Sequence, residues 1–223
     1  MSTETIAAIA TLLGNAGINI VRISGDNSLN IAKKIFVKKN KQEVDYLKPR
    51  YLHYGYIVDE DGKIIDEVLL SYMKKPNTYT REDVIEINCH GGIISARKIL
   101  EMVLNHGCRL AERGEFTKRA FINGRIDLTQ AEAVMDIISS KTDSSYEISM
   151  NHLEGKLSEE INGMISEITK ILANIEVNID FPEYDEEKVT ISQVEKISKK
   201  MIKKIDKLIK TENTGKIFKE GIK

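Results

Sequence analysis

The sequence predicts an α+β protein, with a mixed α/β N-terminal domain in residues 1–120 and an incomplete all-α helical bundle in residues 121–223. In the first half, short apolar runs of strand character alternate with helical patterns, and glycine-bearing turns separate them. In the second half only helical periodicity continues. Between the halves lies the stretch 114–136, which is expected to group basic side chains around two phenylalanines: Lys118, Arg119 and Arg125 around Phe116 and Phe121. A basic and aromatic segment at a change of architecture is a common place for a ligand to bind.

The composition is that of a globular protein, since 41% of the residues are hydrophobic and 30% are charged. No apolar run approaches the ~18 residues that a membrane-spanning helix needs, and residues 1–4 lack the basic start and apolar core of a signal peptide. Cys89 and Cys108 have no metal-ligand spacing and are expected to be reduced and buried. We therefore expect a cytoplasmic protein with no membrane segment and no metal site.

The first two predicted strands are residues 5–11 and 18–23, and both are mostly apolar. Arg22 is the one charge in the second strand. A charged side chain in a buried strand must be paired or must contact a ligand, because leaving it unpaired costs on the order of several kcal/mol. The residues alone leave a core salt bridge and a ligand contact equally open. Polar cap residues 24–28 then begin a helix whose apolar positions recur at helical spacing through Phe36.

A β-hairpin is predicted from residues 51–58 and 63–73, which flank an acidic turn that contains Gly62. The preceding residues 38–48 are mostly polar, and they predict a loop that Pro49 closes.

The next predicted strand ends on two glycines and leads into a helix over residues 93–106, whose apolar stripe stops at Gly107. Glu86 lies in this strand, and Arg22 is its best-placed partner whether the pair is structural or binds a ligand. The paired glycines are a weak ligand signal, because such pairs more often form only a turn. The chain has no G-x-x-x-x-G-K-[ST] phosphate-binding loop. A short last strand is predicted over residues 108–111, before the stretch 114–136.

The helical half opens with Thr129-Gln-Ala-Glu132, which matches a capping box. Apolar residues between positions 144 and 177 step by four and three, which predicts one helix of ~50 Å with a heptad seam. Residues 196–210 carry a lysine-rich helix face. A solvated surface accounts for these lysines first and a nucleic-acid contact second, because no aromatic side chain is interleaved with them.

Two long motifs carry a family resemblance: TYTREDVIEINCHGG at Thr78–Gly92 and GEFTKRAFINGRIDLTQAEAVMDII at Gly114–Ile138. Together with VRISG near the start and DFPE at Asp180–Glu183, they resemble the bacterial tRNA-modification GTPases of the MnmE/TrmE family. The resemblance covers the whole chain, and the motifs keep the order and spacing of the family.

The resemblance implies an N-terminal domain similar to the folate-binding domain of aminomethyltransferases, followed by a helical domain. It implies a homodimer of N-terminal domains that binds 5-formyltetrahydrofolate or a related tetrahydrofolate at the interface. It also implies that the family, with a flavoprotein of the glucose-inhibited division family, installs a carboxymethylaminomethyl-type group on the wobble uridine of tRNA. GTP, magnesium and potassium serve the GTPase domain of the family. Relatives continue into that domain where this chain ends, so we expect no GTP hydrolysis by this chain alone.

The resemblance assigns three cofactor-binding residues: Arg22 in R-I-S-G, Glu86 in E-D-V-x-E, and Arg125 after F-x-N-G. A carboxylate suits the N–H donors of a pterin ring, and arginine suits the anionic glutamate tail of a folate. We assign no catalytic residue and no metal ligand. The chain departs from the family's proline-containing turn at residues 12–14 (Leu-Leu-Gly) and from its proline at Arg113, both in loops near the expected folate site.

Other functions stay open at this stage. A dimerisation or scaffold module would have no folate site and would use Arg22 and Glu86 only as a core salt bridge. A free-standing one-carbon transferase would turn over a folate donor by itself, although the chain has no separate substrate domain. Direct contact of tRNA with the lysine-rich helix would show a steep salt dependence of binding.

Overall fold

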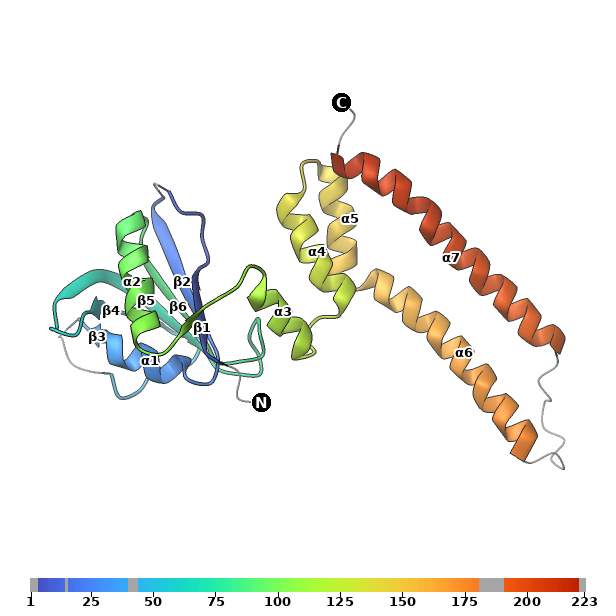
Figure 1. The fold of residues 1–223 in the computed structure, drawn as a ribbon, viewed down its shortest axis with the longest axis horizontal. Coiled ribbons are helices and arrows are strands. Elements are labelled where there is room, and N and C mark those ends of the chain that lie inside the picture. The colour runs from blue at the N-terminus through green and yellow to red at the C-terminus, as the bar shows by residue number, and fades with distance from the viewer. Residues whose placement is uncertain (1–3, 15, 40–43, 181–190, 221–223) are drawn as a thin grey trace. The chain divides into compact units, whose positions relative to one another are not determined.

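The computed structural model describes residues 4–14, 16–39, 44–180 and 191–220 (Figure 1). The chain divides into two compact units, residues 1–125 and residues 126–223. The first unit is a mixed sheet with helices, and the described residues of the second unit form helices, which confirms the predicted α+β fold class. The sequence placed the boundary after residue 120, and the first unit includes the helix at that position and extends to Arg125.

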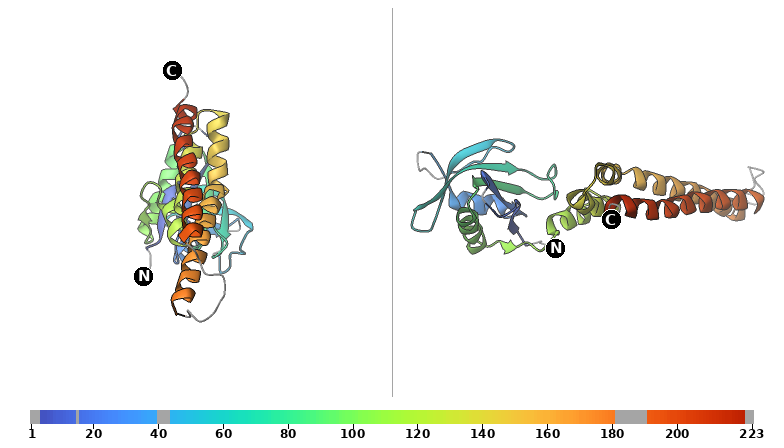
Figure 2. Two further views of the ribbon diagram at one scale, coloured as in Figure 1. Left: turned by 90° about the vertical axis from the view of Figure 1, so that its right-hand side faces the viewer. Right: turned by 90° about the horizontal axis from the view of Figure 1, so that it is seen from above.

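One sheet organises the first unit (Figure 2). Its strand order is β3-β4-β5-β6-β2-β1-β7. Neighbouring strands are antiparallel except β1 and β7, which run parallel. Buried and more exposed positions alternate along β5 and β6, because successive side chains of a strand point to opposite faces. The strands are β1 Ile6–Ile9, β2 Ile18–Ser24, β3 Phe36–Lys38, β4 Leu52–Val58, β5 Ile64–Met73, β6 Val84–His90 and β7 Arg109–Leu110.

The described residues of the first unit form three helices: α1 Ser28–Ile35, α2 Ile93–Asn105 and α3 Glu115–Ile122. α1 and α2 contact each other and the sheet, and their apolar stripes build the core with the inward side chains of β2, β5 and β6. α2 ends at His106 and Gly107, where Gly107 has φ +101°, so the predicted glycine stop of this helix is confirmed. The largest fully buried side chains include Ile23, Ile31, Ile35, Leu70, Ile85, Ile87 and Ile99.

Two glycines in the first unit have clear backbone reasons. Gly62 has φ +75° in the turn between β4 and β5, which confirms the predicted hairpin. A Cβ atom on Gly91 would lie 1.8 Å from the carbonyl oxygen of Ala16. The N–H of Gly91 also donates to the carbonyl of Gly17 at 3.2 Å. The glycine pair after β6 therefore lets two backbone segments meet, as expected of a turn.

The expectation of a polar loop over residues 38–48 was wrong in part. Val44 and Leu47 are 3% and 1% exposed and belong to the core. β3 also reaches into this segment as far as Lys38. Two apolar side chains three positions apart are enough to anchor a segment whose other residues are polar.

The second unit contains α4 Leu128–Ser139, α5 Asp143–Leu153, α6 Lys156–Asp180 and α7 Ile191–Glu220. The predicted capping box at Thr129 and Glu132 was wrong, because the box in the structure begins at Asp127. Asp127 is the N-cap: its carboxylate accepts the N–H of Gln130 at 2.9 Å, and the Gln130 amide oxygen accepts the N–H of Asp127 at 3.0 Å. Thr129 donates its hydroxyl to Asp127 at 2.7 Å. A carboxylate is favoured here because it also interacts with the positive end of the helix dipole.

The predicted single helix over residues 144–177 is two helices. α5 ends at Leu153, and α6 begins at Lys156. Gly155 stands between them with φ +89°, a left-handed conformation that ends a helix. Apolar residues recur at helical spacing on both sides of this point, so apolar spacing alone concealed the break.

α6 and α7 leave much apolar surface open. No side chain of α6 is buried, and the seam residues Ile161 and Ile168 are 37% and 46% exposed. Ion pairs join the two helices, from Lys200 to Glu167 at 3.2 Å and from Lys204 to Glu160 at 3.6 Å. These features agree with an incomplete helical bundle. Within the part of the chain that the structure describes, no helix combines the length and the apolar character needed to cross a membrane.

Candidate functional site

Arg22 and Glu86 face each other across two neighbouring strands. β2 and β6 pair with Arg22 opposite Glu86, which places both side chains on the same face of the sheet. The guanidinium donates to the carboxylate at 2.8 Å. Both side chains are half-buried, with 28% and 23% of their surface exposed. The predicted partnership is therefore formed, at a position that solvent can reach.

Two aromatic rings surround this ion pair. The guanidinium carbon of Arg22 lies 5.8 Å from the ring centre of Tyr79 and 5.5 Å from that of Phe116. Arg125 lies 4.4 Å from the same Tyr79 ring. The structure thus brings the three sequence-predicted residues Arg22, Glu86 and Arg125 into one cluster with Tyr79 and Phe116, which we call the candidate site.

The loop that carries Tyr79, residues 74–83, is fixed to α3 and the residue that follows it. The Tyr79 hydroxyl and the Thr117 hydroxyl share a hydrogen bond of 2.9 Å. Arg81 donates to the carbonyl of Asn123 at 2.9 Å, and the Asn123 amide donates to the carbonyl of Thr80 at 2.6 Å. Tyr79 therefore reaches the candidate site because the loop is bound at several points to the segment that carries Phe116.

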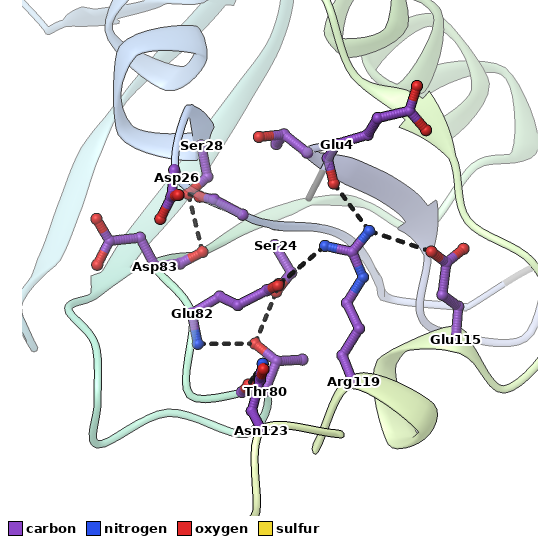
Figure 3. A network of polar contacts seen from close by, with 12 residues as sticks. Glu4, Ser24, Asp26, Ser28, Thr80, Glu82, Asp83, Glu115, Arg119 and Asn123 are labelled. Atoms are coloured by element: carbon purple, nitrogen blue, oxygen red, sulfur yellow. Dashed lines mark hydrogen bonds and ion pairs between the residues drawn. The ribbon is translucent and has the colours of Figure 1, made fainter. Parts of the chain in front are cut away.

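A buried ion-pair network underlies the candidate site (Figure 3). Arg119 on α3 donates to both carboxylate oxygens of Glu82, at 3.1 and 3.0 Å, and to Glu115 at 3.1 Å. It also donates to the carbonyl of Glu4 at 2.8 Å. Ser24 on β2 donates to Glu82 at 2.7 Å. Arg119, Glu82 and Glu115 are each 7% exposed, so the charges compensate one another away from water.

The Glu115 carboxylate in this network has a strongly shifted pKa. Burial by itself would raise its pKa. Hydrogen bonds from the Arg109 guanidinium, the N–H of Glu112 and Arg119 outweigh the burial and lower the pKa of Glu115 to about 2. Arg109 donates to Glu115 at 2.5 Å and to the Glu4 carboxylate at 2.8 Å, and these contacts raise the pKa of Arg109 further.

The prediction that the basic residues of the stretch 114–136 pack around Phe116 and Phe121 was wrong for Arg119. Arg119 points into the buried network, while Phe121 is 41% exposed. The stretch is also not an open turn, since it folds as α3 and α4. One signal could have identified the buried arginine: Glu115 precedes it by four residues, a spacing that places opposite charges together on a helix.

The sheet face that carries Arg22 and Glu86 continues into an apolar row. Residues in register across β2, β6, β5 and β4 share this face, and they are Ile20, Asn88, Leu69 and Tyr54. Leu69 and Tyr54 are 41% and 43% exposed. A depression of about 330 Å³ lies here, lined by Tyr54, Leu69, Asn88 and neighbouring residues. This face is therefore open beside the candidate site.

A second polar cluster stands at the end of β6. Asp66 accepts a hydrogen bond from Ser95 and contacts the His90 ring at 2.6 Å. The hydrogen bond with Asp66 raises the pKa of His90. Cys89 and Cys108 are free and buried, as predicted. In the residues described, no group of three or more histidine, cysteine, aspartate or glutamate side chains could hold a metal ion.

The candidate site has the chemistry for a flat, partly anionic ligand. Aromatic rings offer stacking surfaces, and the Glu86 carboxylate accepts hydrogen bonds from ring N–H groups. The exposed Arg125 guanidinium can pair with a carboxylate in a two-pronged contact.

Comparison with known proteins identifies two regions. Residues 5–125 match the family model of the GTP-binding protein TrmE N-terminus, and residues 128–223 match the model of the MnmE helical domain. The two matched regions correspond closely to the two compact units.

Curated relatives named tRNA modification GTPase MnmE match nearly all of this chain. The protein of Clostridioides difficile (strain 630) is 54% identical over 220 residues, which are 99% of this chain and 48% of the relative. The protein of Alkaliphilus metalliredigens (strain QYMF) is 52% identical, over 98% of this chain and 48% of the relative. The chain spans about half the length of the curated relatives it matches. With both family models matched along its length, the chain belongs to the MnmE/TrmE family of tRNA-modification GTPases.

Proposed function

We propose that this chain supplies the folate-binding and first helical parts of a tRNA-modification GTPase. In this proposal the candidate site binds 5-formyltetrahydrofolate or a related tetrahydrofolate through Arg22, Glu86 and Arg125. The one-carbon unit serves aminomethyl-type modification of the wobble uridine of tRNA, in the cytoplasm and together with a flavoprotein partner.

The observation that carries the proposal is the convergence of the three residues on Tyr79. Arg22 and Arg125 come from β2 and from the residues after α3, 103 positions apart in sequence (125 minus 22), and both contact the Tyr79 ring. Glu86 joins them through its 2.8 Å contact with Arg22. An acceptor, two guanidinium groups and aromatic surfaces at one position match the donors, the carboxylates and the flat ring of a folate.

The open sheet face supports a homodimer through the N-terminal unit. Leu52, Tyr54 and Leu69 expose 58%, 43% and 41% of their surface on neighbouring strands, and Ile18 exposes 60%. Apolar side chains that gather on one face commonly mark a protein interface. A partner copy on this face would lie beside the candidate site.

The proposal assigns no GTP hydrolysis to these 223 residues. The relatives are named as GTPases, but the sequence of this chain has no G-x-x-x-x-G-K-[ST] motif. GTP, magnesium and potassium would then act in the part of the relatives that this chain does not span.

Calorimetric titration of the purified chain with 5-formyltetrahydrofolate tests the proposal, with Arg125→Ala as the matched variant. Arg125 is exposed, so its removal should leave the fold intact. We expect binding by the parent chain and a loss of about tenfold or more in affinity for Arg125→Ala, since an Arg–carboxylate contact contributes on the order of 1.5–3 kcal/mol. Equal binding by both proteins would show that the ligand lies elsewhere.

The formed ion pair also suits a scaffold module without a folate site, since Arg22 and Glu86 satisfy each other in the absence of a ligand. The melting temperature separates the two functions. A ligand that binds the folded chain raises its melting temperature with ligand concentration. A dimer whose melting temperature does not respond to folate would be a scaffold.

A further inference from the structure

We propose that Arg119 is a positioning residue of the candidate site. Its buried guanidinium ties α3 to the 74–83 loop through Glu82 (Figure 3). This connection fixes the aromatic side chains that lie against Arg22. The proposal rests on the proposed function for the identity of the ligand. Its structural part concerns the ligand-free chain and can be judged separately.

The two aromatic rings come from segments that need an external constraint. Tyr79 lies in the loop between β5 and β6, and Phe116 lies in the first turn of α3, a helix of only eight residues. Short helices are marginal by themselves and depend on tertiary contacts. Both rings must nevertheless be held in place, because they are part of the candidate site: each ring centre lies within 6 Å of the guanidinium carbon of Arg22.

Arg119 supplies this constraint from the centre of α3. Its guanidinium bonds the loop through Glu82, its own helix through Glu115, and the start of β1 through the carbonyl of Glu4. The planar guanidinium of arginine carries several N–H donors and can bond these three partners in different directions. A lysine ammonium cannot reproduce this arrangement of donors. Since Ser24 on β2 also donates to Glu82, the constraint extends to the strand that carries Arg22.

Arg119 itself stands behind the site. Its side chain is 9% exposed and the donor contacts above all go to protein groups, whereas Arg125 is exposed and Arg22 is 28% exposed. The role of Arg119 is therefore to hold other side chains in place.

Arg109 offers a matched control. It bonds two of the same residues, Glu115 at 2.5 Å and Glu4 at 2.8 Å, and it also donates to the carbonyl of Leu110 at 2.9 Å; these three residues lie outside the 74–83 loop. Loss of the Arg109 fork should weaken the network without releasing Tyr79.

The experiment uses the absence of tryptophan from the chain. Phe116→Trp places one fluorescent reporter in the candidate site, and Arg119→Lys or Arg109→Lys is added to it. Far-UV circular dichroism and the melting temperature establish folding. Tryptophan emission and acrylamide quenching report the site in the ligand-free chain. In parallel, each lysine variant without the reporter is titrated with 5-formyltetrahydrofolate.

We expect Arg119→Lys to shift the emission to longer wavelength, to increase quenching, and to weaken folate affinity about tenfold, because site geometry must be held within about 0.5 Å. Arg109→Lys should change the emission little and the affinity less than about threefold at a similar loss of melting temperature. Unchanged emission and affinity in Arg119→Lys would overturn the proposal. So would a loss of affinity that follows the melting temperature equally in both variants, because that pattern means general stability.

A second variant serves if Arg119→Lys does not fold. Glu82→Gln keeps the size of the side chain and leaves Arg119 paired with Glu115. It should produce the same spectral shift in the reporter chain, and an unchanged spectrum would count against the proposal. If the parent chain binds no folate, the proposed function fails, while the ligand-free spectra still decide whether Arg119 positions the site.

Discussion

At the scale of single residues, the first unit contains two arginine–glutamate pairs with different roles. The side chains of Arg22 and Glu86 are 28% and 23% exposed, whereas the side chains of Arg119 and Glu82 are both 9% exposed. In a partly solvated ion pair, a ligand can replace one partner at a small cost in free energy, because water already solvates both charges. A buried pair cannot, because separation would leave a charge without compensation. Exposure therefore separates the pair suited to binding from the pair suited to support.

Glu115 should make the stability of the first unit depend on pH. Its pKa is about 2 in the folded chain against an ordinary 4.5, so its contribution is complete above pH 4.5 and is lost as the pH falls through about 2. The contribution is at most about 3 kcal/mol. Glu115→Gln should lower stability at pH 7 and flatten the dependence between these limits. Urea unfolding at a series of pH values measures both effects.

Glu101→Gln is the control for this prediction. Glu101 forms an exposed pair with Arg97 on α2, and such pairs contribute less than about 1 kcal/mol. A pH dependence that is the same in the parent chain and in Glu115→Gln would contradict the assignment.

The three predicted site residues and the side chains that were missed differ in how sequence encodes them. Arg22 and Glu86 could be paired because one charge in an apolar strand requires a partner. Arg125 came from the family resemblance alone. Tyr79 was not singled out, because its role depends on hydrogen bonds to α3 from a loop 38 positions earlier. Arg119 resembled its basic neighbours, and apart from the spacing to Glu115 its role depends on burial in the folded chain.

At the scale of elements, Gly155 determines where the long helical segment divides. Apolar spacing continues on both sides of it, so helical periodicity gives no sign of the break. The left-handed backbone at φ +89° is open to glycine and costly for other residues.

Gly155→Ala should lower the stability of the helical unit by about 1 kcal/mol or more, since alanine is strained at positive φ. An added Cβ would also lie 3.3 Å from the Gln130 amide nitrogen. Gly163→Ala is the opposite case. Gly163 lies inside α6 with open space around it, so alanine should stabilise the unit by about 0.5–1 kcal/mol. Thermal melting followed by circular dichroism compares the two, and equal effects would contradict this explanation.

Elements with a strong local pattern were predicted well. The hairpin, β6, α2 and the stop at Gly107 follow from alternation, apolar stripes and glycine turns, which are properties of neighbouring residues. The start of α4 was misplaced because Asp127, Thr129 and the nearby glutamine and glutamate offer two overlapping capping boxes. Val44 and Leu47 were assigned to a polar loop because their burial depends on the distant core.

At the scale of the whole molecule, the candidate site and its support lie in one compact unit. The contacts described above for the cluster around Tyr79 and for the buried network join residues between Glu4 and Arg125.

Excised residues 1–125 should therefore fold and bind 5-formyltetrahydrofolate with an affinity within about threefold of the full chain, as expected for an independent domain. Circular dichroism and calorimetry on both proteins provide the comparison. Binding by the full chain together with no binding by the folded excised unit would show that the helical unit takes part.

The parallel pairing of β1 with β7 also has a consequence for biosynthesis. Ile6 pairs with Arg109, and the Glu4 carbonyl accepts a hydrogen bond from Arg119, 115 positions later in the chain. During synthesis, one edge of β1 therefore stays unpaired until almost the whole unit has been translated. Contacts between such distant positions slow folding. Stopped-flow refolding of residues 1–125 should be slower after β7 pairing is weakened, and an unchanged rate would show that this edge closes after the rate-limiting step.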